Sequence, residues 1–115
     1  ALVGASADPA KYGNIIVKNL QSKGFDVIPI NPREKEIEGL RVYGSLADVD
    51  RPVGLINFVV PPAVTLAVLK NIAGIGFDSV WFQDGSFDEQ VLAYAAGHFE
   101  HVVSGACIMV VTNYT

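Results

Sequence analysis

Residues 1–13 read ALVGASADPAKYG, a short apolar run followed by a glycine-containing turn that leads into a segment with helical spacing. Small or apolar residues recur there at three- and four-residue steps: Gly13, Ile16, Val17 and Leu20. This spacing predicts an amphipathic helix over 12–23, and Gly24 stands where a carboxyl-terminal cap belongs. A strand, a turn and a helix in this order are typical of the first unit of a parallel α/β sheet.

The same alternation continues along the chain. The short apolar runs bounded by turn residues are Ala1–Ala5, Val27–Ile30, Leu55–Val60, Val80–Phe82 and Val102–Val103. Helical spacing returns from Pro62 to before Gly74 and from Phe87 to Gly97, whereas 31–52 contains only a weak short helix near 45–49. Because the runs are continuously apolar, the sheet is covered on both faces. We therefore expect an α/β, Rossmann-like doubly wound sheet of about five mainly parallel strands, with helices on both faces.

Length and composition limit the class of protein. The chain has 115 residues, half of them hydrophobic, which predicts a single domain over 1–115. It begins at Ala1 inside an apolar run and without Met, so we expect that amino-terminal residues are missing. The net charge of −4 disfavours a nucleic-acid partner, because phosphate neutralisation needs a basic surface.

Membrane and metal partners are also not expected. The longest mainly apolar stretch, Phe58–Leu69, contains two prolines and falls short of the roughly 18 residues that a membrane span needs. One cysteine, Cys107, excludes an intrachain disulfide and a multi-thiolate metal site, and suits a cytoplasmic location. We expect a buried, inert thiol, the alternative being a nucleophile that uses His98 or His101 as its base.

The first loop has the features of a phosphate site. Gly4 lets backbone approach a ligand closely, Ser6 offers a hydroxyl group, and Lys11 adds a cation near the start of the helix. The amino end of a helix presents free N–H groups and the positive end of its dipole to an anion. We therefore expect a phosphate or pyrophosphate group here.

The dinucleotide fingerprint Gly-x-Gly-x-x-Gly is not met. Counted from Gly4, its second and third glycines would fall at Ser6 and Pro9. The second apolar run ends in Pro-Ile-Asn-Pro-Arg and offers no acidic residue for the ribose of NAD. Arg33 instead suits an additional nucleotide phosphate, as in NADP or coenzyme A.

The chain as a whole resembles the small stand-alone CoA-binding proteins. These proteins are similar to the nucleotide-binding domain of the succinyl-CoA synthetase α subunit and of NDP-forming acyl-CoA synthetases. The motifs that carry the resemblance are, in chain order, Val3-Gly4-Ala5-Ser6 with Pro9, Lys11 and Gly13; Ile28-Pro29-Ile30-Asn31-Pro32; Ile37-x-Gly39 with Tyr43-x-Ser45-Leu46-x-Asp48; Val60-Pro61; Trp81-x-Gln83-x-Gly85; and Cys107-Ile108-Met109-Val110. Together they span nearly the whole chain. The chain departs from the family at Ala106, where a basic residue is usual, and at 57–59, where a polar or acidic strand end is usual.

The resemblance implies a set of contacts with coenzyme A. Its phosphates meet Gly4, Ala5 and Ser6, helped by Lys11; the adenosine 3′-phosphate region borders Asn31, Pro32 and Arg33; and Val60 and Pro61 flank the adenine. Arg33 and Lys35 are both candidates for the basic residue of the second loop. Gln83 and Gly85 follow a strand, so their position predicts that they line the crevice, a tight turn being the alternative.

The sequence thus predicts a protein that binds coenzyme A or an acyl-CoA, a small nucleotide ligand, through the first strand–helix loop without catalysis of its own. The alternatives are an NADP-linked oxidoreductase domain and the detached nucleotide-binding part of an NDP-forming acyl-CoA synthetase. The acyl group and the oligomeric state stay open. Asn57 interrupts an apolar strand and needs hydrogen-bond partners if it is buried.

Overall fold

Parallel strands form the central sheet of the computed structural model, which describes residues 1–112. The strands are β1 (Leu2–Val3), β2 (Pro29–Ile30), β5 (Ile56–Phe58), β6 (Ser79–Phe82) and β7 (His101–Ser104). Their order in the five-stranded sheet is β2-β1-β5-β6-β7, and every neighbouring pair is parallel. From β1 the chain therefore winds first toward one edge of the sheet and later toward the other, which confirms the predicted doubly wound fold.

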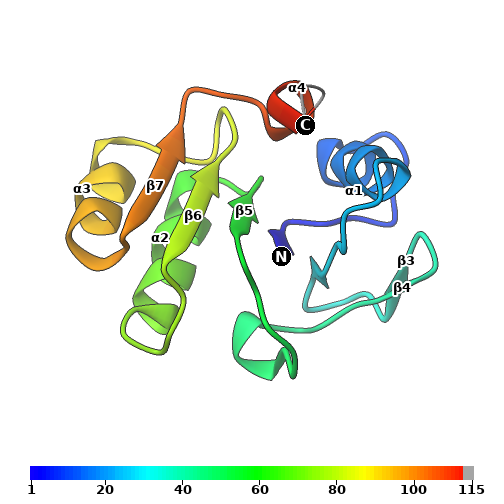
Figure 1. The fold of residues 1–115 in the computed structure, drawn as a ribbon, viewed down its shortest axis with the longest axis horizontal. Helices are drawn as coiled ribbons and strands as arrows, with labels where there is room; N and C mark the ends of the chain where they lie inside the picture. The colour runs from blue at the N-terminus through cyan, green and yellow to red at the C-terminus, as the bar shows by residue number, and fades with distance from the viewer. Residues whose placement is uncertain (113–115) are drawn as a thin grey trace.

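Helices cover both faces of this sheet, as predicted. They are α1 (Tyr12–Ser22), α2 (Pro62–Ile72), α3 (Glu89–His98) and α4 (Ile108–Val111). Figure 1 shows α1 beside α4 and α2 beside α3, in agreement with their packing. Because parallel crossovers are right-handed, the reversal of winding at β1 places α1 on one face and α2 and α3 on the other.

The core consists of two apolar clusters, one for each face. Successive residues of a strand point to opposite sides, so Leu2 packs in the cluster of α1 and α4 while Val3 packs in the cluster of α2 and α3. Phe58 and Phe82 are fully buried in the second of these clusters, with ring centroids 5.5 Å apart. The strands that carry the candidate site are thus packed on both sides.

The connection between β2 and β5 contains more structure than the sequence indicated. It forms an antiparallel ribbon of β3 (Glu36–Ile37) and β4 (Leu40–Arg41), followed by the short 3₁₀-helix η1 (Leu46–Asp48). The ribbon is bound to α1, because the Asn14 side chain donates to Glu38 Oε2 at 3.2 Å. Two-residue strands are too short to show a periodic pattern, so only the short helix was predicted.

Two further differences concern helices. The third helix begins at Glu89 rather than at Phe87, because the Asp88 carboxylate accepts a hydrogen bond from the N–H of Val91 at 2.9 Å and caps the helix there. The four-residue helix α4 was not predicted. Within residues 1–112, every helix falls short of the length and apolar character that a membrane crossing requires.

Candidate functional site

A cavity of about 650 Å³ opens at the carboxyl ends of β1, β2 and β5, where the winding of the sheet reverses. Its lining comes from the loop after β1, the residues after β2, the segment that enters η1, and the segment from the end of β5 through α2. Of the predicted ligand-contacting residues, the cavity brings together Gly4, Ala5, Ser6, Lys11, Asn31, Pro32 and Val60. Ligands of doubly wound sheets bind at this position.

The loop after β1 depends on two glycines. Gly4 has φ +100°, and a Cβ added there would lie 2.8 Å from side-chain carbons of both Val59 and Val60. A Cβ at Gly13 would collide with the carbonyl oxygen of Gly4. The loop therefore lies directly against both the start of α1 and the end of β5, and side chains at these two positions would force it away.

Polar contacts hold the rest of this loop. The Ser6 hydroxyl accepts from the N–H of Asp8 at 3.1 Å, and the Asp8 carboxylate accepts from the N–H of Ala10 at 3.0 Å. From α1, the Asn14 side chain donates to the Ser6 carbonyl at 2.9 Å. No side chain caps the amino end of α1, whose N-cap residue is Lys11. Unpaired N–H groups of the first helical turn therefore remain available to an anion.

Asn31 joins the second loop to the first. Its Nδ2 donates to the Ala5 carbonyl at 2.9 Å, and its Oδ1 accepts from the N–H groups of Arg33 and Glu34 at 2.8 and 3.3 Å. Asn31 and Pro32 line the cavity, so the residue that the sequence assigned to the ligand also fixes the geometry of both loops. The position of Asn31 after the second strand could be predicted from the sequence. Its hydrogen bond to the Ala5 carbonyl could not, because it joins two loops that are distant in the sequence.

Among residues 1–112, three cationic side chains in the loop after β1 and the segment after β2 have no counter-ion. Within residues 1–112, the side chains of Lys11, Arg33 and Lys35 have no hydrogen-bond or ion-pair partner. By contrast, Lys18, Arg41 and Arg51 each pair with a carboxylate: Lys18 with Glu38, Arg41 with Asp50 and Arg51 with Asp26. Lys11 lines the cavity, whereas Arg33 and Lys35 are exposed, follow Pro32 in the chain and do not belong to the lining.

Sequence reasoning did not identify the apolar wall of the cavity. Val64, Val68 and Ile72 follow one another at four-residue steps along α2, and Leu46 of η1 also lines the cavity. Their spacing predicted a helix but not what covers it: Ile72 is buried, whereas Val64 is 45% exposed. The remaining lining residues that were not predicted are Val3, Ile30, Gly44, Ser45, Ala47 and Asn71.

Four predicted residues do not line the cavity: Arg33, Pro61, Gln83 and Gly85. Pro61 directly follows the lining residue Val60 and starts α2 as its N-cap. The Gln83 amide is buried and occupied elsewhere, since it donates to Cys107 Sγ at 3.3 Å and accepts from the N–H of Ile108 at 3.0 Å. Gly85, with φ +84°, belongs to the turn after β6, as the alternative interpretation held.

Cys107 is half-buried and belongs to a polar cluster rather than to an inert core. Its sulfur lies 3.0 Å from the Tyr12 hydroxyl and accepts from Gln83. Burial raises the pKa of this thiol, but the hydrogen bonds from Tyr12, Gln83 and two backbone N–H groups of α4 outweigh burial and leave the pKa below its usual value. The bond to Cys107 also raises the pKa of Tyr12 to about 12.

The histidines are engaged elsewhere among the described residues. His98 stacks on Tyr94 with ring centroids 3.9 Å apart, and its Nδ1 lies 2.8 Å from the Tyr94 carbonyl. His101 lies 3.8 Å from the carboxylate of Glu100. Within residues 1–112, no imidazole contacts the Cys107 sulfur, so the pairing of a thiol with a histidine base does not form.

The chain is similar to a family of CoA binding domains and to several known proteins. The sequence profile of the CoA binding domain matches residues 1–113. The chain is 35% identical over 89 residues to an ADP-forming acetate–CoA ligase of Methanocaldococcus jannaschii, a match that covers 77% of this chain but only 13% of the ligase. It is 26% identical to the uncharacterised protein YneT of Bacillus subtilis, covering 96% of this chain and 82% of YneT.

Solved structures agree with the sequence matches. A conserved hypothetical protein from Pyrococcus furiosus is 50% identical, with a TM-score of 0.88, and the match covers 95% of this chain and 94% of that one. A hypothetical protein from Pyrococcus horikoshii OT3 is 29% identical, with a TM-score of 0.90, and the match covers 98% of this chain and 80% of that one.

Proposed function

The chain belongs to the CoA binding domain family, and from this membership we propose that it binds coenzyme A or an acyl-CoA in the cavity at the carboxyl ends of β1, β2 and β5, without catalysing a reaction itself. One observation carries the proposal. The cavity joins the uncapped amino end of α1 and the unpaired cation of Lys11 to an apolar wall along α2. These two halves suit the phosphates and the adenine of one nucleotide.

The phosphate end of the ligand lies, in this proposal, against Gly4, Ala5 and Ser6. The absent side chain at Gly4 lets this loop lie directly against the end of β5, and the dipole of α1 adds favourable electrostatics for the phosphates. Lys11 supplies the one cationic side chain of the lining. We expect it to contact the pyrophosphate.

The adenosine end lies between the second loop and α2. Val60, Val64 and Leu46 offer apolar surface on which a flat base can pack. The 3′-phosphate then lies near Asn31 and Pro32, where either Arg33 or Lys35 can pair with it, since both are exposed and without a counter-ion among residues 1–112.

A binding role is supported by the kinds of side chain in the cavity. Among the described residues, its lining contains no histidine, cysteine, aspartate or glutamate. Serine and lysine side chains of the lining could act as nucleophiles, but histidine and the carboxylates, the usual general bases, are not beside them in it. The Tyr12–Gln83–Cys107 cluster does not contribute to this lining.

Calorimetric titration with CoA, 3′-dephospho-CoA, NAD and NADP tests the proposal, because these ligands differ at the groups in question. We expect CoA to bind most tightly, 3′-dephospho-CoA to bind more weakly, and both nicotinamide nucleotides to bind weakly or not at all. Tight binding of NADP with no heat from CoA would overturn the proposal and favour the oxidoreductase alternative.

Matched lysine variants locate the site. Lys11→Ala removes the cation in the lining and should weaken CoA binding about tenfold, which corresponds to about 1.4 kcal/mol. Lys18→Ala, on the same helix but paired with Glu38 and outside the lining, should leave the affinity within about twofold. Equal effects of the two substitutions would mean that the ligand binds elsewhere.

The similarity to ADP-forming acetate–CoA ligases favours a second candidate, in which the chain is the CoA-binding part of such an enzyme and works with separate parts. A ligase variant that lacks the matching segment provides the test. Recovery of acetyl-CoA formation from ATP, acetate and CoA on addition of this protein would support that candidate. Tight CoA binding without any recovery would support binding alone.

A further inference from the structure

Two carbonyl groups of the loop after β1 are held by side chains from outside that loop. The Asn31 side chain donates to the Ala5 carbonyl, and the Asn14 side chain of α1 donates to the Ser6 carbonyl, each at 2.9 Å. A trans peptide group is planar, and its N–H points away from its C=O. The N–H groups of Ser6 and Ala7 are therefore directed away from the two asparagines. Within residues 1–112, neither N–H has a hydrogen-bond acceptor.

Asn14 is itself held by the β3–β4 ribbon. It is fully buried, and the Nδ2 that donates to the Ser6 carbonyl also donates to the Glu38 carboxylate at 3.2 Å. Both hydrogens of the amide group are thus used. A buried donor without a partner is unfavourable, so loss of Glu38 would favour rotation of the Asn14 amide away from the Ser6 carbonyl. Glu38 thereby stabilises the orientation in which Asn14 holds the loop.

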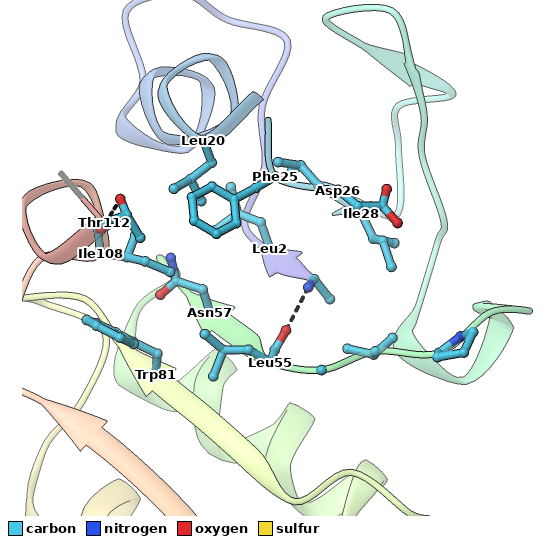
Figure 2. Close-up of a pocket in the computed structure, with 15 residues that line it drawn as sticks. Leu2, Leu20, Phe25, Asp26, Ile28, Leu55, Asn57, Trp81, Ile108 and Thr112 are labelled. Atoms are coloured by element: carbon cyan, nitrogen blue, oxygen red, sulfur yellow. Dashed lines mark hydrogen bonds between the residues drawn. The ribbon is translucent and has the colours of Figure 1, made fainter. Parts of the chain in front are cut away.

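The helix α1 turns one stripe toward the sheet and another toward the ribbon. Leu20 points to the sheet, where it packs in the apolar cluster of that face beside a smaller cavity of about 370 Å³ (Figure 2). A different stripe consists of Asn14, Lys18 and Gln21, which lie four and three residues apart. All three contact Glu38, since Lys18 Nζ lies 3.9 Å from Glu38 Oε1 and Gln21 Nε2 donates to the Glu38 carbonyl at 3.3 Å. Three successive helical turns therefore bind one residue of the ribbon.

The turn of the ribbon would be more favourable with a residue other than Glu38. Glu38 and Gly39 connect the paired residues Ile37 and Leu40, and their φ angles are +50° and +79°. Two-residue turns with positive φ at both positions strongly favour asparagine, aspartate or glycine at the first of them. Among the non-glycine residues of 1–112, Glu38 alone has a positive φ. Its contacts with α1 therefore maintain a strained backbone, as is typical of residues with a functional role.

We propose that Glu38 is a positioning residue for the loop after β1: through Asn14 it holds the Ser6 carbonyl so that the Ala7 N–H is presented to a phosphate. The inference rests on the proposed function, which assigns this loop to the phosphates of the ligand. Glu38 does not line the larger cavity, so it acts through Asn14 rather than by contact with the ligand. Its negative charge alone would repel a phosphate, so electrostatics and positioning predict opposite effects of its removal.

Glu38→Ala and Glu38→Gln distinguish these two effects. Both substitutions remove the charge, but the amide oxygen of glutamine can still accept from Asn14. Calorimetry should show that Glu38→Ala binds CoA about fivefold more weakly than the parent, the factor that one net hydrogen bond provides. Glu38→Gln should bind within about twofold of the parent. Unchanged or tighter binding by Glu38→Ala would overturn the inference.

Glu36→Ala is the matched control for Glu38→Ala, because it removes an exposed carboxylate from the same ribbon. Within residues 1–112 the Glu36 side chain has no hydrogen-bond or ion-pair partner. Its removal should not weaken CoA binding. A loss equal to that of Glu38→Ala would show that the Asn14 contact is not the cause.

Glu38→Asn separates the contact with Asn14 from the stability of the turn. Asparagine suits a positive φ, but its side chain is one methylene group shorter, so we expect that it does not reach Asn14. In urea unfolding this variant should be more stable than Glu38→Ala, while the two should bind CoA equally weakly. If CoA affinity instead follows stability, the effect belongs to the ribbon as a whole and the inference is wrong.

Inorganic pyrophosphate separates the inference from the proposed function, because it provides the anion without the adenosine. In NMR titrations of the ¹⁵N-labelled protein, it should shift the Ala7 backbone N–H in the parent and in Glu38→Gln, and much less in Glu38→Ala. This pattern without any CoA binding would contradict the proposed function and leave the inference standing. CoA binding by the parent with no shift of the Ala7 N–H would overturn the inference alone, and a parent that binds neither ligand would overturn both.

Discussion

Gly4 is the residue at which the loop after β1 has no alternative to glycine. Its φ of +100° lies in a region that side chains rarely adopt, and the space for a Cβ is taken by Val59 and Val60. Strain and steric conflict therefore act together at one position. Glycine avoids both the backbone strain and the steric conflict, and so allows the loop to adopt the conformation that faces the cavity.

Gly4→Ala should destabilise the protein by about 1–3 kcal/mol and abolish measurable CoA binding, because the loop must move away from β5. Urea unfolding and calorimetry with CoA measure the two effects. Gly54→Ala is the matched control, since a Cβ there meets nothing within 4 Å, and its unfolding free energy should stay within about 0.5 kcal/mol of the parent. Unchanged CoA affinity in Gly4→Ala would contradict the proposed position of the phosphates.

Cys107 is a second residue whose properties arise from its neighbours. The thiol reacts as the thiolate, so a pKa below the usual value means a larger reactive fraction at neutral pH. Tyr12, with its pKa raised to about 12, remains a protonated donor throughout the titration of the thiol.

Tyr12→Phe should shift the midpoint of the pH–rate profile for iodoacetamide alkylation of Cys107 to higher pH. The substitution removes a hydrogen bond that favours the thiolate, so the pKa of the thiol rises and the rate at neutral pH falls. Tyr94→Phe, whose ring stacks on His98 instead, serves as the control and should leave the midpoint in place. An unchanged midpoint in Tyr12→Phe would show that the thiolate does not depend on this contact.

At the scale of elements, α1 and α3 begin in opposite ways. The side chain of Asp88 caps α3, whereas Lys11 stands at the N-cap of α1 without capping it. A side-chain cap stabilises a helix but occupies the N–H groups that an anion would use. Of these two helices, it is the uncapped α1 whose N-cap residue lines the cavity.

Asp88→Ala should lower the free energy of unfolding by about 1 kcal/mol, because the N–H of Val91 loses its partner. Asp88→Asn should retain most of the stability, since asparagine caps helices about as well as aspartate. Urea unfolding of the two variants beside the parent gives the comparison. A loss of equal size in both variants would assign the effect to charge rather than to capping.

At the scale of the whole molecule, the net charge of −4 opposes the binding of an anion, so the proposed function depends on cations near the larger cavity. Carboxylates neutralise several surface cations, but within residues 1–112 none neutralises Lys11, Arg33 or Lys35. In the proposed complex these three cations would supply the local positive charge that attracts the phosphates.

CoA affinity should fall several-fold between about 50 mM and about 500 mM NaCl, because added salt screens exposed charges. If CoA affinity proves independent of salt, the phosphates are not held by these cations.

The sequence by itself determined the succession of the main strands and helices along the chain and the character of the first loop, whereas the order of the strands within the sheet came from the structure. Apolar runs, helical spacing and Gly4 are local signals, and burial on both faces of a parallel sheet imposes the continuous runs. The residues that follow the strands could therefore be predicted as candidates, and the cavity brings most of them together, from Gly4 to Val60.

Only the tertiary structure decided which partner each polar side chain finds. Gln83 was assigned to the crevice from its position after β6, but its amide binds Cys107 and the backbone of Ile108, a segment 25 residues away. Val64 and Val68 line the cavity rather than a closed core, and the buried amide of Asn57 has no hydrogen-bond partner among residues 1–112. Periodicity shows that a side chain lies on one side of an element, whereas what covers that side depends on segments distant in the sequence.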